Sequence, residues 1–329
     1  MRKNSLPKYL VYSFVALFIA NVIWAAAVPV IKLTLDYVPL FTFLFLRFLL
    51  VCLVLLPYII MELKKHPVNT RDIPNLILLG LFGQSGIAFV FAGLKYATAL
   101  DTAILGVITP ILAIAAGHYF YKEKVNIYIK LGVVFATIGT LFIVLEPILT
   151  QNHSTVDPLL RLWGNILVII YDITFLMYIL WSKVSNGQTS RLVKRTLNFI
   201  HLKPMTGTYP TTLLTAITFY VALATFIPLF ILENLGFFGP VNFSVQNLTT
   251  VPIFGIIYMA IFSSIVAYML FVWALKASSI GDTAFFTYLG PVLTLPFAYV
   301  LLKEVPTPLT LIGTGITALG VIIAEKKKA

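Results

Sequence analysis

The chain has 329 residues, of which 60% are hydrophobic and 11% are charged, and its formal net charge is +11. A soluble domain carries about 25% charged residues, so this chain could not cover a water-facing surface. The composition excludes a soluble globular protein and predicts an integral membrane protein. Its net charge is then explained by basic cytoplasmic loops, not by nucleic acid as a partner.

Long apolar segments run through the whole sequence. Crossing about 30 Å of hydrocarbon requires about 20 apolar residues in a helix. Each such segment must be helical, because unpaired backbone groups are too costly in lipid, and a β-barrel would show short alternating strands instead. Ten transmembrane helices are expected, in chain order, at 9–35, 38–61, 73–96, 99–120, 127–146, 160–183, 210–233, 250–275, 279–302 and 307–324.

The second half of the chain repeats the first. Residues 94–139 align with 275–320 without a gap, at a constant offset of 181 residues. The identities include Pro, Gly and charged residues, so shared hydrophobicity alone does not explain them. Internal repeats of this kind are typical of secondary transporters, whose substrate site lies between the repeats. The identical pairs are Leu94/Leu275, Lys95/Lys276, Asp101/Asp282, Thr102/Thr283, Ala103/Ala284, Pro110/Pro291, Leu112/Leu293, Lys122/Lys303, Glu123/Glu304, Gly132/Gly313 and Gly139/Gly320.

The basic residues predict the orientation of these spans. With the N-terminus inside, 18 of the 23 Lys and Arg residues fall in cytoplasmic segments, so both termini are expected in the cytoplasm and the location in the cytoplasmic membrane. The first apolar run is too long for a signal peptide and is interpreted as a retained span. Glu123 then lies inside and its repeat partner Glu304 outside. We therefore expect two inverted five-helix repeats, residues 1–150 and 151–329, with a basic cytoplasmic loop at 184–209.

Several motifs occur in a consistent order in both halves. The first span reads Trp24-Ala-Ala-Ala-Val-Pro29-Val-Ile-Lys32, followed by Pro39 and Arg47-Phe-Leu. Each half then has Leu-Lys, Asp-Thr-Ala opening a helix, a mid-helix Pro, Lys-Glu, and a span with two Gly seven residues apart. Over nearly the whole chain, this order resembles the EamA-type branch of the drug/metabolite transporter superfamily. The resemblance implies a ten-helix carrier that moves amino acids, other metabolites, nucleotide sugars or drugs by alternating access.

Two charged residues within the spans are the sharpest candidates for function. Asp172 lies near the middle of the sixth span, where a charge costs roughly 2.5–3.5 kcal/mol and by default signals function. It could protonate and couple transport to a proton gradient, bind a substrate ammonium group, or hold two helices together. Arg47 lies roughly 12 Å below the outer end of the second span at 1.5 Å per residue. It could bind a carboxylate or phosphate, or pair with an acid such as Asp172.

Polar and aromatic residues of other spans form a second group of candidates. Asn21 and Trp24 share one face of the first span, and Gln84 interrupts the third. Either a cavity wall or contacts between helices would explain them. We expect a central substrate cavity between the repeats, with bending at prolines that interrupt helices. The expected lining residues are Asn21, Trp24, Arg47, Gln84, Asp172, Tyr268 and Trp273, and the expected hinges are Pro29, Pro110 and Pro291.

Other charged residues have simpler interpretations. Asp101 and Asp282 each open a helix as Asp-Thr-Ala, and N-capping explains both. Lys32, near the outer end of the first span, is expected to extend its amine to the membrane interface.

The sequence has no motif of soluble enzyme chemistry: no Walker loop, zinc-ligand spacing, Rossmann fingerprint or nucleophile elbow. We therefore expect no catalytic residues, no metal and no cofactor. The leading hypothesis is a secondary transporter for a small organic solute such as an amino acid, with protons as a candidate coupling ion. A membrane-embedded enzyme, a channel and a non-transporting scaffold are the alternatives. An enzyme would need a cluster of His and acidic residues at one membrane face, which the sequence does not show. The few polar residues, scattered over spans one, two, three and six, suit one enclosed site better than a channel.

Overall fold

The computed structural model describes residues 8–106, 109, 112, 116, 119–120, 127–150, 157–185, 191–199, 201–239, 248–274 and 289–325. Every regular element within these ranges is helical, as the composition predicts. The elements are α1 (Lys8–Leu35), α2 (Leu40–Lys65), α3 (Ile73–Gly80), the π-helix η1 (Leu81–Ser85), α4 (Ile87–Leu94), α5 (Ala99–Leu105), α7 (Ile127–Thr150), α8 (Pro158–Ser185), α9 (Arg191–Phe199), α10 (Thr211–Asn234), α11 (Thr250–Ile257), the π-helix η3 (Tyr258–Val266), α12 (Ala267–Ala274), α14 (Gly290–Leu302) and α15 (Pro308–Glu325).

Helices long and apolar enough to cross a membrane occur at six of the expected spans, judged by length and composition. Two shorter apolar helices, Gly290–Leu302 and Pro308–Gly320, fall within the ninth and tenth. The expectation of an all-α integral membrane protein is therefore confirmed. The six long helices are Val11–Leu35, Leu40–Lys65, Ile73–Leu94, Pro158–Ser182, Thr211–Asn234 and Thr250–Phe271.

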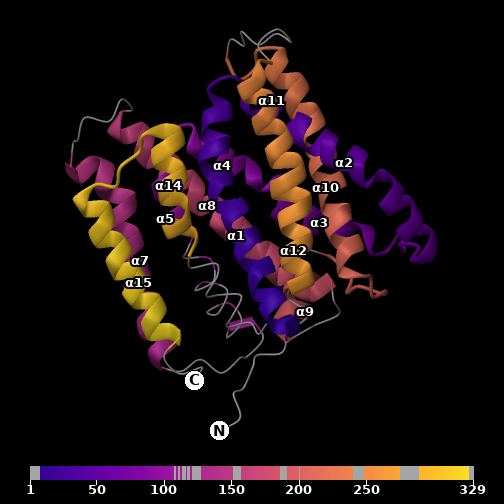
Figure 1. Ribbon diagram of the computed structural model, residues 1–329. Helices are drawn as coiled ribbons and strands as arrows, with labels where there is room; N and C mark the ends of the chain where they lie inside the picture. Colours follow the sequence, from indigo (N-terminus) through magenta and orange to yellow (C-terminus); the bar gives the residue numbers. More distant parts are fainter. Residues whose placement is uncertain are drawn as a thin grey trace.

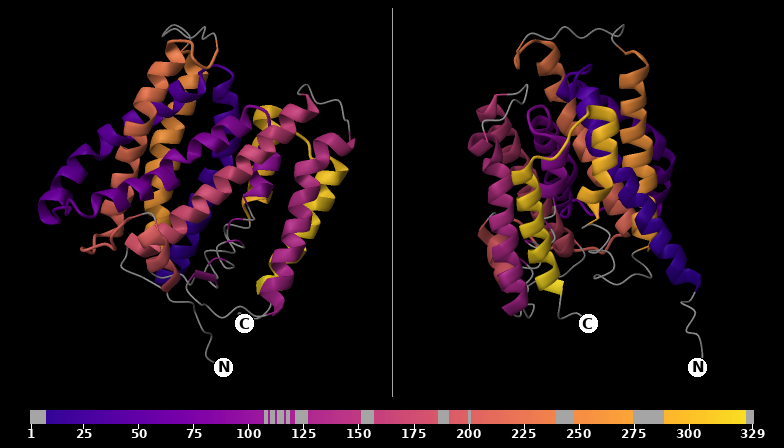
Figure 2. Two further views of the ribbon diagram at one scale, coloured as in Figure 1. Left: turned by 180° about the vertical axis from the view of Figure 1, so that it is seen from behind. Right: turned by 60° about the vertical axis from the view of Figure 1, so that its left-hand side comes forward.

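The last described helix, α15, packs along α7, and the two lie side by side at one edge of the molecule (Figures 1 and 2). Glycines allow this close approach. A Cβ added to Gly139 on α7 would lie 2.6 Å from the carbonyl oxygen of Gly313 on α15, and one added to Gly313 would lie 2.9 Å from that of Gly139. Small residues at such contacts let helices associate in lipid through van der Waals packing.

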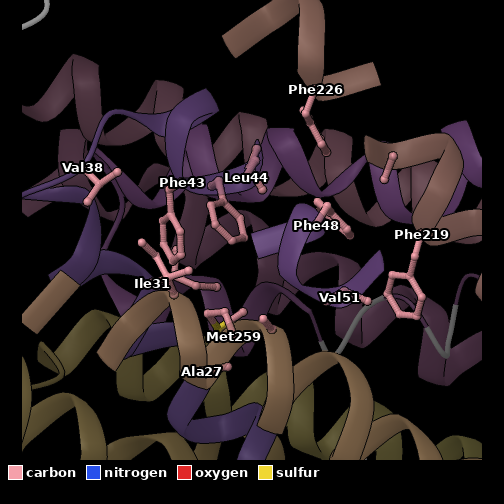
Figure 3. Close-up of a cluster of buried hydrophobic side chains, with 14 of the residues drawn as sticks. Ala27, Ile31, Val38, Phe43, Leu44, Phe48, Val51, Phe219, Phe226 and Met259 are labelled. Carbon is pink, nitrogen blue, oxygen red and sulfur yellow. The ribbon is translucent and has the colours of Figure 1, made fainter. Parts of the chain in front are cut away.

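A buried aromatic cluster joins α1, α2, α4, α10 and η3, and much of it is drawn in Figure 3. Phe48 on α2 stacks on Phe226 of α10 with ring centroids 5.4 Å apart, and Phe43 meets Phe91 of α4 at 5.2 Å. Aromatic pairs of this geometry add about 0.5–1.5 kcal/mol beyond the area that they bury. The cluster therefore fixes α2 against its neighbours on both sides of Arg47, which lies one residue before Phe48.

The segment 184–209, expected to be a loop, is partly helical. Helix α8 extends to Ser185, and α9 follows at Arg191–Phe199. In α9, Leu197 is buried while Lys194, Arg195 and Asn198 are exposed. This short amphipathic pattern is stable because its apolar face packs on the bundle, a tertiary contact that a count of charged residues does not reveal.

The segment after α9 is fastened to the start of α3 by Asp72. This buried carboxylate accepts hydrogen bonds from the Thr206 amide (2.8 Å), the Gly207 amide (3.1 Å) and the Tyr209 hydroxyl (2.8 Å). Burial alone would raise the pKa of Asp72, but these hydrogen bonds outweigh it and hold the pKa below its ordinary value. The carboxylate therefore stays ionised, and the tether intact, at neutral pH.

The contact between α7 and α15 is tested by the variant Gly139→Ala. Its Cβ would press on the backbone of α15, which cannot move aside as a flexible side chain would, so we expect a loss of about 1–3 kcal/mol of stability. Thermal unfolding of the purified protein in detergent measures the change. The matched control is Gly315→Ala on α15, where an added Cβ has no atom within 4 Å. Equal melting temperatures for both variants would contradict the close packing.

Candidate functional site

Two π-helical segments interrupt transmembrane helices, one in each half of the chain. Adding the repeat offset of 181 residues to η1 (Leu81–Ser85) gives 262–266, which lies within η3 (Tyr258–Val266). In each case the π-helix lies between two short α-helices, in the order α3–η1–α4 and α11–η3–α12. The π-helix is rare and frequently marks functional sites. The offset that relates residues 94–139 to 275–320 thus also places η1 within the range of η3.

Arg47 on α2 is directed at η3. Its Nε and Nη2 atoms donate to the Ser264 hydroxyl at 3.2 and 2.9 Å, and Ser264 in turn donates to the Met259 carbonyl. The guanidinium carbon lies 5.1 Å from the Phe48 ring centroid and 5.7 Å from that of Phe91. Arg47 is only 4% exposed. The charge is thus held by one neutral hydroxyl and two aromatic faces, with further N–H donors available for a ligand.

Trp24 on α1 reaches the same π-helix. Its indole N–H donates to the carbonyl of Ser263 at 3.0 Å, and its ring meets that of Tyr268 on α12 edge-on at 6.3 Å. The Tyr268 hydroxyl lies 3.0 Å from the Tyr178 hydroxyl of α8, within hydrogen-bond distance. Three of the residues that we expect to line the site are therefore close to η3: Trp24 and Arg47 bind it, and Tyr268 in α12 meets Trp24.

Helix α8 connects this cluster with the other π-helix. Tyr171, Phe175 and Tyr178 follow one face of α8, with successive ring centroids 6.0 and 5.6 Å apart. A Cβ added to Gly83 in η1 would lie 2.7 Å from the Tyr178 ring, so the backbone of η1 rests directly on this stack. The Tyr171 hydroxyl also lies close enough to Arg47 to interact with it electrostatically.

Asp172 lies beside this aromatic stack, on an adjoining face of α8. It is 2% exposed, its Oδ1 atom accepts from the Thr109 hydroxyl at 3.0 Å, and its Oδ2 atom has no hydrogen-bond partner. No carboxylate of the described residues lies within 4.0 Å of the Arg47 guanidinium, so the ion pair with Asp172 that we considered does not form in this structure. Arg47 and Asp172, two buried groups of opposite charge in the same helix bundle, are thus each bound by neutral partners.

The structure places the remaining candidates in different surroundings. Gln84 is buried within η1, and its Oε1 atom has no hydrogen-bond partner. Asn21 is buried and donates to the Leu17 carbonyl of its own helix. Trp273 on α12 is 38% exposed. Pro29 lies inside the continuous helix α1, and Pro291 lies in the first turn of α14. Pro110, like Asp282, lies outside the described residues.

The expectation that Asp101 caps its helix is wrong, because Thr98 caps α5. The Thr98 hydroxyl accepts from the Asp101 amide at 2.9 Å, which leaves the Asp101 carboxylate to bind Arg161 at 2.8 Å. Glu304 completes the cap by accepting from the Ala99 amide at 2.8 Å. Lys32 donates to Glu304 at 2.8 Å and does not extend free to the membrane interface. These charge-assisted bonds are stronger than the single contacts expected from sequence.

Ser264, Tyr171 and Tyr178 belong to the cluster although the sequence did not single them out. A signal for each is visible in retrospect. The Ser263-Ser264 pair interrupts an apolar span at the position that the repeat assigns to Phe82-Gly83 of η1. The three aromatic residues of α8 are spaced three and four apart, which places them on one face beside Asp172.

The hydrogen bonds from Arg47 to Ser264 of η3 are tested by the variant Ser264→Ala. This change leaves a buried guanidinium without its hydroxyl partner, and hydrogen bonds to charged groups are worth about 1.5–3 kcal/mol. We expect the unfolding free energy to fall by about that amount. Ser263→Ala is the matched control, since its backbone carbonyl, and not its hydroxyl, binds Trp24. The difference is measured by denaturant titration in detergent, and equal losses in both variants would contradict the specific contact.

Comparison with known proteins gives the same family over both halves. The model of the EamA-like transporter family matches residues 12–145 and 196–325. An uncharacterized transporter of Archaeoglobus fulgidus is 27% identical, with 95% of this chain and 96% of that protein covered. The uncharacterized transporter YetK of Bacillus subtilis is 25% identical, with 96% and 87% covered.

A solved crystal structure is similar in fold. It has a TM-score of 0.57 at 17% sequence identity, and the match covers 95% of this chain and 96% of that one. At this identity the likeness concerns the fold alone. The family match spans most of the sequence, and the helices long enough to cross a membrane agree with it. The chain belongs to the EamA-like transporter family.

Proposed function

We propose that the protein is a secondary transporter that moves a zwitterionic solute, such as an amino acid, across the cytoplasmic membrane by alternating access. The observation that carries the proposal is the pair of uncompensated buried charges, Arg47 and Asp172. A buried charge without a partner costs several kcal/mol. A solute with a carboxylate and an ammonium group would supply a partner to each, so its binding energy would come from charges that the empty protein leaves unbalanced.

The proposed site lies between two inverted repeats of five transmembrane helices, residues 1–150 and 151–329. The equivalent positions of η1 and η3 support this arrangement, because each repeat then contributes one π-helix to the same cluster. The excess of Lys and Arg in alternate connecting segments supports cytoplasmic termini. In this topology the solute would enter from either face as the repeats rock against each other, with bending at Pro29, Pro110 and Pro291.

Asp172 is the proposed coupling residue. Its carboxyl group lies in the bundle interior, where one oxygen binds Thr109 and the other has no partner. The unpartnered oxygen can accept a proton or an ammonium group, and a buried carboxylate that gains neither is energetically unfavourable. Protonation and solute binding would then compete for the same oxygen. Competition of this kind couples the flow of a solute to the flow of protons in the opposite direction.

The proposal is tested by transport into liposomes that contain the purified protein. A mixture of amino acids and common metabolites is supplied, with and without a pH gradient. We expect selective flux that responds to the gradient. Arg47→Gln should reduce this flux by about tenfold or more, since a contact between charged groups is worth about 1.5–3 kcal/mol. Asp172→Asn should abolish the response to the gradient.

Asp157→Asn serves as the control, because it removes an exposed carboxylate at the start of the same helix, α8. The melting temperatures of the variants show whether each remains folded. Flux that is unaltered by both Arg47→Gln and Asp172→Asn would remove these residues from the site and contradict the proposal.

A further inference from the structure

A polar pocket of about 380 Å³ lies away from the cluster at the π-helices. Its walls are residues 65–69, at and after the end of α2, and residues 206–209, which precede α10. The loop that joins α2 to α3 lies beside the segment that leads into α10, at one edge of the molecule (Figures 1 and 2). Ligand sites commonly have volumes of about 300–1,000 Å³. We call this site the loop pocket.

Buried hydrogen bonds hold the two walls of the loop pocket together. The Asn69 amide donates to the Tyr209 hydroxyl at 3.1 Å, and this hydroxyl donates to Asp72 at 2.8 Å. The side-chain amide of Asn75 on α3 donates to the Lys203 carbonyl at 2.9 Å. The shape of the pocket is therefore set by the fold, which spares a ligand the entropic cost of ordering the two segments.

The side chains that line the loop pocket offer hydrogen-bond donors. Lys65 contributes an ammonium group, His66 an imidazole and Thr208 a hydroxyl. Asn69 accepts from the Arg71 amide through Oδ1 at 3.0 Å, so its NH₂ group is the part that can bind a ligand. Charged oxygen atoms are the strongest acceptors for donors of this kind, and a phosphate group presents several of them.

The charge around the loop pocket is positive. Glu62 lies 3.3 Å from Lys65, but this pair is exposed and therefore weak, so a phosphate can compete with Glu62 for the lysine. Asp72 is already engaged by the hydrogen bonds that hold the walls. The Lys, Arg, Asp and Glu residues of the described segments 62–72 and 201–209 are Lys64, Lys65, Arg71 and Lys203 against Glu62 and Asp72.

Three helices that are long enough to cross a membrane end or begin at the loop pocket. Helix α2 ends at Lys65, α3 begins at Ile73 and α10 begins at Thr211. The pocket thus lies where apolar spans give way to loops, which is the level of the lipid headgroups. Exposed apolar side chains on the adjoining turns of α2 and α3 face the level of the acyl chains; they are Ile60, Met61, Ile73 and Ile77.

We propose that the loop pocket binds the phosphate of an anionic membrane lipid. The residues that donate to this phosphate are Lys65, His66, Asn69 and Thr208. Basic pockets between helices at a membrane interface suit such headgroups. A soluble phosphate would meet the same donors, but only a lipid also covers the exposed apolar turns beside them. The proposal does not depend on the identity of any transported solute.

Native mass spectrometry of the purified full chain tests the choice of ligand. The protein is incubated in detergent with an equal mixture of phosphatidylglycerol and phosphatidylcholine, whose choline cation balances its phosphate. We expect one phosphatidylglycerol to be retained in preference to phosphatidylcholine. Equal retention of the two lipids would overturn the proposal. Inorganic phosphate is then added as a competitor, and displacement of phosphatidylglycerol at equal concentration would show a site for a soluble anion and contradict the assignment to a lipid.

Matched variants place the bound lipid in the loop pocket. Lys65→Gln should weaken the retention of phosphatidylglycerol by about fivefold, the contribution of one basic residue near an anionic lipid. Lys194→Gln is the control, because it removes the same charge from an exposed position of α9 outside the pocket. Thr208→Glu brings a carboxylate into the pocket and should abolish the preference, whereas Thr249→Glu, at an exposed position before α11, should leave it unchanged.

All four substitutions are at exposed positions, and the melting temperatures show that each variant is folded. Retention that is unaltered by both Lys65→Gln and Thr208→Glu, or that falls equally in Lys194→Gln, would contradict a lipid site in this pocket.

Discussion

In a lipid bilayer no water satisfies a buried polar group, and this constraint organises the whole bundle. The chain meets it repeatedly with an acid from one helix that binds groups of another. Glu233 at the end of α10 accepts from the Phe41 and Thr42 amides at the start of α2, at 3.0 and 2.7 Å. Glu304 does the same for α5. Each acid caps a helix with negative charge at its positive end and at the same time fixes the position of one segment against another.

The charged groups of the candidate site differ from these acids, because their partners are neutral. Arg47 has a serine hydroxyl and two aromatic rings in place of a carboxylate, and Asp172 has a threonine hydroxyl in place of a cation. Gln84, on the opposite π-helix, keeps an oxygen without a partner. Unpaired polar groups are rare in a folded interior, and Gln84 and the hydroxyl that binds Arg47 lie in the two segments that depart from regular α-helix, η1 and η3. A solute that completes these contacts would be bound by helices from both halves of the sequence.

Hydropathy predicted where the long helices lie, because a segment of about twenty apolar residues in a membrane must form a helix to pair its backbone groups. It also identified Arg47, Asp172 and Gln84 as buried, since polar groups in such spans must face the protein. The partners could not be predicted. Asp101 pairs with Arg161, sixty residues away, and Lys32 with Glu304 of the other half, which only the packing of distant helices determines. Helix α9 was missed because its stability comes from burying one face against the bundle.

Access to Gln84 from the two sides of the membrane distinguishes a carrier from a sealed bundle. A Gln84→Cys variant, with the buried Cys52 replaced by alanine, places a single thiol within η1. Membrane-impermeant thiol reagent is applied either outside or inside oriented liposomes. If the polar cluster is a transport site, the thiol should be labelled from both faces, with rates that shift in opposite directions when the pH gradient is reversed. Labelling from one face only, or from neither, would contradict alternating access at this site.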